Sequence, residues 1–145
     1  MSRTDQPARS ACPLNFALEI FGDRWTLIVL RDLLLKSRRR YGELLACEEG
    51  IATNVLADRL RRLEQRGLLT KERDTEDARQ YLYRPTQQAV ALVPMLVEMV
   101  VWGARNSKSS VERDFLKRFE RDRDRLIADI QDQIRRERAS GSRSA

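Results

Sequence analysis

The sequence lacks histidine altogether and contains only two cysteines, Cys12 and Cys47. Without histidine, the commonest metal ligand and the usual general base near neutral pH are missing. This excludes Ser-His-Asp and Cys-His catalysis and zinc sites that need an imidazole, and two cysteines cannot form a four-cysteine site. Carboxylates or lysine could still act alone, but no convergent nucleophile and base are visible. We therefore expect no enzyme, no metal and no cofactor.

Long apolar runs are also missing from the sequence. The longest, over residues 89–102, is interrupted by Pro94 and Glu98, which makes it too short and too broken to span a bilayer. The first ten residues are polar and contain no apolar signal core. We therefore expect a cytoplasmic protein without membrane contact, in which both cysteines are reduced thiols.

Charge, in contrast, is abundant. Lys and Arg number 28 against 22 Asp and Glu, which gives a formal net charge of +6. The pI near 9.9 favours contact with polyanions, although many basic proteins carry as much charge. A length of 145 residues, 41% of them hydrophobic, suits one soluble domain with an appendage.

Apolar spacing and end signals predict a mainly α-helical chain with one small β-hairpin. Asp23 is expected to cap the second helix, and Pro94 to kink the long fifth one. The predicted helices cover residues 13–21, 24–35, 41–47, 53–65, 87–105 and 111–138, and the predicted strands cover 68–73 and 80–84.

The order of these elements divides the chain into four parts. A flexible arm over residues 1–11 precedes a domain over 12–106, and a C-terminal helix over 107–138 precedes a disordered tail over 139–145. The C-terminal helix carries an apolar stripe that needs a partner, so we expect it to extend a dimer interface. The alternative is a solvated helix with frayed ends. The stripe consists of Phe115, Phe119, Leu126, Ile130 and Ile134.

A short helix, a turn, an amphipathic helix and a hairpin in direct succession form a winged helix-turn-helix, here followed by long C-terminal dimerisation helices. The helix over 53–65 buries a leucine row and leaves a polar face narrow enough for a DNA major groove. Asn54 can bond an adenine, and Arg79 can reach a minor groove from a loop that Asp74 and Asp77 brace. The predicted DNA-binding residues are Arg38, Arg39, Arg40, Thr53, Asn54, Arg59, Arg61, Arg62 and Arg79.

Several motifs along residues 12–105 carry a family resemblance. They are Cys12-Pro13, Gly22-Asp23-Arg24-Trp25, Arg40-Tyr41-Gly42-Glu43-Leu44, Gly50-Ile51, Gly67-Leu68, Arg79-Gln80-Tyr81 and Trp102-Gly103. At these residues the sequence resembles the bacterial HxlR-type branch of the MarR-like winged-helix regulators. The resemblance implies a homodimer that binds a palindromic operator in double-stranded DNA and regulates transcription. The chain departs from the family pattern at Ala52, Pro85 and Ala89, where serine, leucine and glycine are usual.

The resemblance also places a thiol at Cys12, which in some family members senses oxidants or electrophiles. A sensing thiol needs a favoured thiolate, and a helix start with Arg9 and Arg24 nearby would supply that. The alternative is a small residue packed at the dimer interface. Trp25 and Trp102 are candidates for a pocket that binds a small-molecule effector, or else for core and interface anchors.

The rival to a DNA-binding regulator is a protein-interaction module that uses a winged helix as a scaffold without specific DNA binding. Asn54, Arg61 and Arg79 on one side favour DNA, while Asp58 on the same face is a mild objection.

Overall fold

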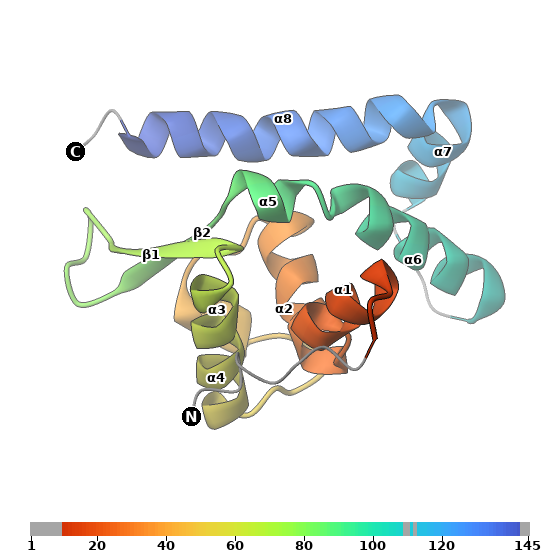
Figure 1. Ribbon diagram of the computed structural model, residues 1–145. Helices are drawn as coiled ribbons and strands as arrows, with labels where there is room; N and C mark the ends of the chain where they lie inside the picture. The colour runs from red at the N-terminus through yellow and green to blue at the C-terminus, as the bar shows by residue number, and fades with distance from the viewer. Residues whose placement is uncertain (1–9, 109–110, 112, 143–145) are drawn as a thin grey trace.

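Helices dominate the computed structural model, which describes residues 10–108, 111 and 113–142 (Figure 1). The mainly α fold with one antiparallel hairpin confirms the predicted fold class. Most of the predicted N-terminal arm, residues 1–9, and the end of the predicted tail, residues 143–145, lie outside the described part. The elements are α1 (Pro13–Phe21), α2 (Arg24–Leu34), α3 (Tyr41–Leu45), α4 (Thr53–Gln65), β1 (Leu69–Arg73), β2 (Tyr81–Pro85), α5 (Gln87–Val90), α6 (Val93–Asn106), α7 (Arg113–Arg121) and α8 (Arg123–Ser142).

Helix α2 forms the centre of the core, as its nearly all-round apolar sequence predicts. The carboxylate of Asp23 accepts a hydrogen bond from the Thr26 backbone N–H at 3.1 Å, which confirms the predicted N-cap. Leu30, Leu33 and Leu34 are almost fully buried. Helix α2 is therefore the central helix against which α1, α3 and α4 pack.

Helices α3 and α4 are joined by a turn, and the hairpin follows directly. Gly50 and Gly67 adopt positive φ angles of 72° and 75°, which residues with a side chain rarely tolerate. Gly67 ends α4 as predicted, whereas α3 ends at Leu45, two residues earlier than expected. Strand β1 pairs antiparallel with β2, with Lys71 opposite Tyr83. The helix-turn-helix and the wing thus have the predicted order.

The predicted continuous helix over residues 87–105 is wrong, because the chain breaks after Val90 and starts α6 at Val93. Pro94 lies in the first turn of α6, where the missing proline N–H costs no hydrogen bond. Proline therefore starts a helix here instead of kinking one.

The predicted continuous helix over 111–138 is also wrong, because it divides at Asp122 into α7 and α8. The carboxylate of Asp122 accepts from the Arg125 N–H at 3.0 Å and so caps α8. Helix α8 continues to Ser142, so the predicted disordered tail does not begin at residue 139. Its apolar residues Leu126, Ile127 and Ile134 are buried within the same chain.

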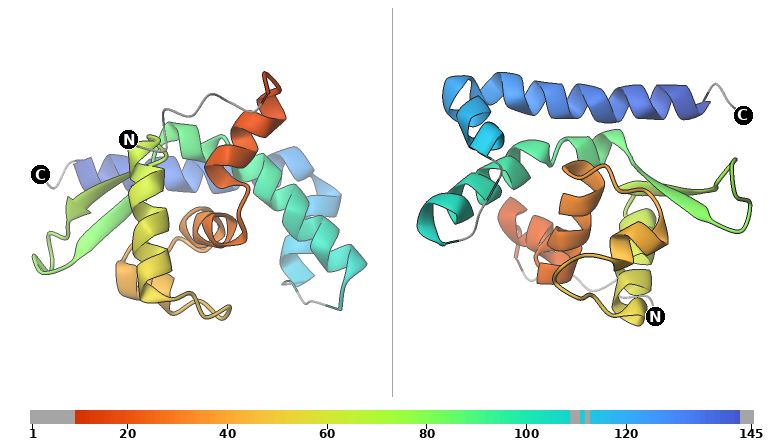
Figure 2. Two further views of the ribbon diagram at one scale, coloured as in Figure 1. Left: turned by 60° about the horizontal axis from the view of Figure 1, so that its bottom comes forward. Right: turned by 180° about the vertical axis from the view of Figure 1, so that it is seen from behind.

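Figures 1 and 2 show the resulting arrangement. Helices α3 and α4 and the hairpin gather at one end of the molecule, and α6 and α7 lie at the other. Helix α8 packs against α5, α6 and α7 and runs from the α7 end to the hairpin.

Within residues 87–106, an 18-residue window has a mean hydropathy of 1.4, so length and composition alone would permit a membrane span. In the fold the stretch is split between α5 and α6, and it supplies buried core residues such as Val93 and Val97. Its apolar character is thus explained in part by packing within the chain.

Candidate nucleic-acid interface

The position of α4 is set by its leucine row and by a bond from α3. Leu56, Leu60 and Leu63 are buried on one face of α4. The Tyr41 hydroxyl donates to the Thr53 carbonyl at 2.9 Å and ties the start of α3 to the start of α4. The opposite face, with Thr53 and Asn54 in the first turn, is exposed. This arrangement presents small polar side chains at the end of a fixed helix.

Three predicted DNA-contacting arginines of α4 surround a single carboxylate, Asp58. Its oxygens lie 2.6 Å from Arg59, 2.8 Å from Arg61 and 2.9 Å from Arg62. Burial opposes ionisation of Asp58, but the Arg61 hydrogen bond and the charges of Arg62 and Arg59 hold its pKa below the ordinary value. The face therefore keeps an excess of positive charge despite Asp58.

Arg59 differs from Arg61 and Arg62 because it also bonds the carboxylate of Asp23, at 2.9 Å. Its side chain is only 20% exposed, whereas those of Arg61 and Arg62 are 61% and 43% exposed. Arg59 thus joins α4 to the N-cap of α2, and the two later arginines remain accessible.

The wing loop is held by the two aspartates that the sequence singles out. Buried Asp74 accepts from the Glu76 N–H at 2.9 Å and from Arg40 at 2.6 Å, and Asp77 accepts from the Arg79 N–H at 3.1 Å. These backbone bonds are the main reason that the pKa of each aspartate lies below its ordinary value. Arg79 itself is 92% exposed. The braced loop therefore holds an arginine at its tip.

A helix-turn-helix and a braced wing at one end of the molecule agree with the comparisons. The HxlR-like helix-turn-helix family model matches residues 20–111. The chain belongs to the HxlR-like helix-turn-helix family. Its homologues in this family are regulators of transcription with a helix-turn-helix.

Two curated relatives show the extent of the likeness. The uncharacterized HTH-type transcriptional regulator sll1512 of Synechocystis is 32% identical over 88 residues, which cover 61% of this chain and 64% of that protein. The regulator Rv3095 of Mycobacterium tuberculosis is 37% identical over 87 residues, covering 60% and 54%. The chain thus spans less than two thirds of the length of these relatives.

Two solved structures have the same fold. PA1607 shares 32% identity with a TM-score of 0.63, covering 73% of this chain and 78% of that one. The redox regulator HypR in its oxidized form shares 26% identity with a TM-score of 0.59, covering 66% and 98%. The HxlR-like fold of the chain is therefore supported by sequence and by structure.

In this HxlR-like chain, each arginine of the cluster at 38, 39 and 40 forms an ion pair within the molecule. Arg38 binds buried Asp32 at 3.0 Å, Arg39 binds Glu137 at 2.7 Å, and Arg40 binds Asp74. Burial lowers the pKa of Arg39, and the Glu137 charge offsets part of that effect. Contacts of these arginines with DNA phosphates stay a prediction.

Sequence reasoning missed a hollow of about 470 Å³ between α3 and the wing. Three tyrosines, at 41, 81 and 83, line it together with Gly42, Arg79 and Gln80. Lys71 and Arg73 on β1 lie over the Tyr81 ring, at 4.2 and 5.0 Å from its centroid. Residues two apart on a strand share a face, so the spacing of Lys71 and Arg73 could have indicated that both cations lie on the same side of the hairpin.

The two thiols lie in different environments. Cys12 is exposed immediately before α1, and Cys47 is buried in the core. The Cys12 backbone N–H donates to the Ser10 hydroxyl at 3.3 Å. The part of the chain that the structure describes contains no group of three His, Cys, Asp or Glu side chains that could hold a metal ion.

The two tryptophans also differ in their exposure to solvent. Trp25 packs partly buried against the core, with the Arg24 guanidinium 5.0 Å from its ring centroid, whereas Trp102 on α6 is 70% exposed. A pocket shared by both stays a prediction. Trp102 belongs instead to a set of exposed apolar side chains on α1 and α6, which we call the α1–α6 face: Leu14, Phe16, Leu18, Met99 and Trp102.

Proposed function

We propose that the chain is a dimeric, cytoplasmic regulator that binds a palindromic operator in double-stranded DNA. The observation that carries this proposal is the exposed first turn of α4 at the same end of the molecule as the braced wing loop with Arg79 (Figure 2). A helix of this kind enters a major groove, and an arginine on a neighbouring hairpin suits a narrow minor groove.

The residues divide by the part of DNA they would meet. Thr53 and Asn54 would approach base edges, since they are exposed at the start of α4. Arg61 and Arg62 would bind phosphates, because exposed ion pairs such as theirs with Asp58 contribute little and exchange readily. Arg38 and Arg40 retain partial exposure beside α3 and would act as further phosphate contacts.

The test is a titration of DNA from the region upstream of the protein's own gene at several salt concentrations. We expect specific binding that weakens with salt, and a slope smaller by about one for Arg79→Ala. Arg125→Ala is the matched control, because Arg125 on α8 has the same charge and high exposure away from the wing. Absence of specific, salt-dependent binding in reduced and in oxidised protein would favour an interaction module instead.

The dimer is supported by the α1–α6 face. Its large apolar side chains, on α1 and on α6, are exposed in one protomer. Apolar patches of this kind mark protein interfaces. A two-fold dimer that reads a palindrome with its two α4 helices requires half-sites about 34–36 Å apart, or a multiple of that.

Cys12 is proposed as a thiol that senses oxidants or electrophiles at this interface. It is exposed, it precedes α1 directly, and HypR, a redox regulator, has the same fold. Diamide or a quinone should change the affinity for DNA in the wild type and in Cys47→Ser, but not in Cys12→Ser. Unchanged binding with Cys12 fully modified would leave a small-molecule effector near Trp25 or Trp102 as the signal.

A further inference from the structure

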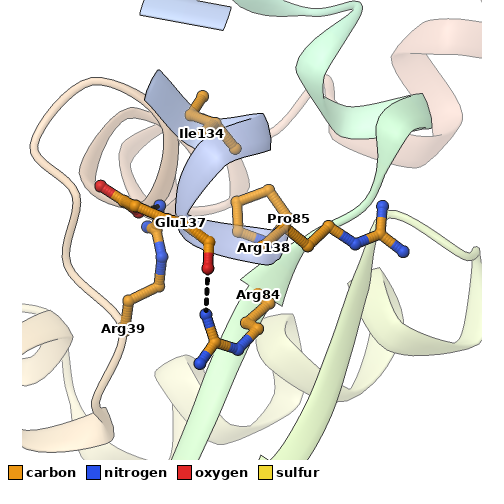
Figure 3. A pocket seen from close by; sticks show the side chains of 6 residues that line it. All are labelled: Arg39, Arg84, Pro85, Ile134, Glu137 and Arg138. Atoms are coloured by element: carbon orange, nitrogen blue, oxygen red, sulfur yellow. Dashed lines mark hydrogen bonds and ion pairs between the residues drawn. The ribbon is translucent and has the colours of Figure 1, made fainter. Parts of the chain in front are cut away.

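The end of α8 contacts the base of the wing through Glu137 (Figure 3). The Glu137 carboxylate accepts a hydrogen bond from Arg39 Nη2 at 2.7 Å, and its backbone carbonyl accepts one from Arg84 Nη1 at 3.4 Å. Ile134 and Pro85 are buried beside this pair. Residues 98 and 53 positions apart from Glu137 thus meet at one point.

The two arginines that Glu137 holds belong to the elements that would read DNA. The Arg39 carbonyl accepts from the Tyr83 N–H at 2.8 Å, so the segment before α3 pairs with β2. Arg84 extends from β2 and also binds Glu72 on β1. Through Arg39 and Arg84, the end of α8 is therefore connected to both strands and to the start of α3.

Arg39 depends on Glu137 for its charge balance. Its side chain is only 12% exposed, and its other hydrogen bonds go to the carbonyls of Leu33 and Arg38. A covered guanidinium without a carboxylate is unfavourable, so loss of Glu137 would push Arg39 toward solvent. The pairing of the Arg39 segment with β2 would move with it.

Gly141 shows how closely α8 approaches the wing. A Cβ at this position would lie 2.7 Å from Nη2 of Arg84. Glycine is unfavourable inside a helix, but here it leaves the space that the Arg84 guanidinium occupies. An added methyl group would displace Arg84 without removing any charge.

The wing needs such support because it is a sheet of only two strands. An isolated hairpin is at best marginally stable in water and requires packing from a third element. The α3 side supplies part of this packing, and α8 supplies contacts at the wing base through Glu137. Helix α8 lies beyond the residues 20–111 that match the family model.

We propose that the last turns of α8 act as a strut that fixes the wing for DNA binding, with Glu137 as the positioning residue. The link to DNA rests on the proposed function. The strut itself is a property of the free protein.

The experiment compares Glu137→Gln, Gly141→Ala and the matched control Asp132→Asn, in full-length protein. Asp132 is a carboxylate on the same helix, but it binds Arg135 of α8 and not the wing. In Glu137→Gln, hydrogen exchange at the Tyr83 amide should accelerate and DNA affinity should fall roughly threefold to tenfold. Asp132→Asn should leave both unchanged.

Two further arms separate positioning from a general loss of stability. Gly141→Ala raises helix propensity, so it should weaken DNA binding while thermal stability stays equal or rises. In an Arg79→Ala background, the effect of Glu137→Gln on affinity should largely disappear, because both changes act through the wing.

Unchanged Tyr83 exchange in Glu137→Gln would overturn the strut. If Glu137→Gln lowers DNA affinity by the same factor in the Arg79→Ala background as in the wild type, Glu137 does not act by positioning the wing. If the wild type binds no DNA, the proposed function fails alone, because exchange at Tyr83 still decides whether α8 holds the wing.

Discussion

Helices α1 and α8 carry similar apolar stripes and use them in opposite ways. Leu126 and Ile134 of α8 are almost fully buried against the same chain. Phe16 and Leu18 of α1 are more than half exposed, and no residue of α1 is fully buried. The same kind of pattern therefore closes the core in one region and remains open in another.

An apolar stripe therefore indicates a surface that packs against another element, but it does not identify that element. Helix α8 finds its partners, α5 and α6, within the same chain. Helix α1 packs on α2, and its outer side chains stay exposed. The dimer role that the sequence suggested for the C-terminal stripe thus passes, in our proposal, to the α1–α6 face.

The largest loss of stability is expected on α8, whose apolar stripe is buried within the same chain. Leu126→Ala should reduce the free energy of unfolding by about 3 kcal/mol, because it leaves a cavity at a residue that is 1% exposed. Urea denaturation at two protein concentrations measures this, with exposed Gln133→Ala as the control. A loss that appears only at low concentration would mean that a second chain covers the stripe.

The next effect concerns the open region. Trp102→Ala should raise the dimer dissociation constant by roughly thirtyfold, about 2 kcal/mol, since a large exposed aromatic is a typical interface anchor. Sedimentation equilibrium measures the constant. Phe119→Ala is the counterpart, because Phe119 packs partly buried against the core and should lower monomer stability instead. Equal dimerisation of Trp102→Ala and wild type would contradict the proposed interface.

The comparison also shows which parts of the fold the sequence could predict. The Asp23 cap and the α4 boundaries were predicted correctly because they depend on neighbouring residues. The breaks before Pro94 and at Asp122 were missed, although proline in a first turn and aspartate at an N-cap are known start signals. Apolar periodicity continues across both breaks, so it does not locate them.

The residues of the candidate site also differ in whether the sequence could predict their surroundings. Exposure of Asn54 and Arg79 follows from local position, so the sequence could indicate both. The pairing of Arg39 with Glu137, 98 positions later, depends on how α8 packs. No local pattern distinguishes an arginine that will meet phosphate from one that will meet a distant carboxylate.

A smaller effect is expected at the DNA-facing end. Asn54→Ala should cost about 1.4 kcal/mol, or tenfold in affinity, at one base position, because a paired amide contact to adenine is lost. Competition with single-base operator variants measures it. Gln133→Ala on α8, another exposed amide, should have no effect. A uniform loss over all base variants would show that Asn54 does not read a base.

The smallest effect compares ion pairs in the two regions. Arg31 and Glu49 join α2 to the turn before α4 through two parallel hydrogen bonds, one of 3.0 Å, while Arg118 and Asp129 form a more exposed pair between α7 and α8. Glu49→Gln should lower stability at pH 7 by about 1 kcal/mol, and Asp129→Asn by no more than a few tenths. Thermal denaturation of both variants measures the difference.

The pH dependence of the Glu49 pair gives a further check. The hydrogen bond from Arg31 lowers the pKa of Glu49 from its usual 4.5 to about 2. Because the folded-state pKa is the lower one, the contribution to stability is complete above pH 4.5 and is lost as the pH falls toward 2. The wild type and Glu49→Gln should therefore converge in stability across this range. A constant difference down to pH 2 would mean that the carboxylate charge does not stabilise this end of the molecule.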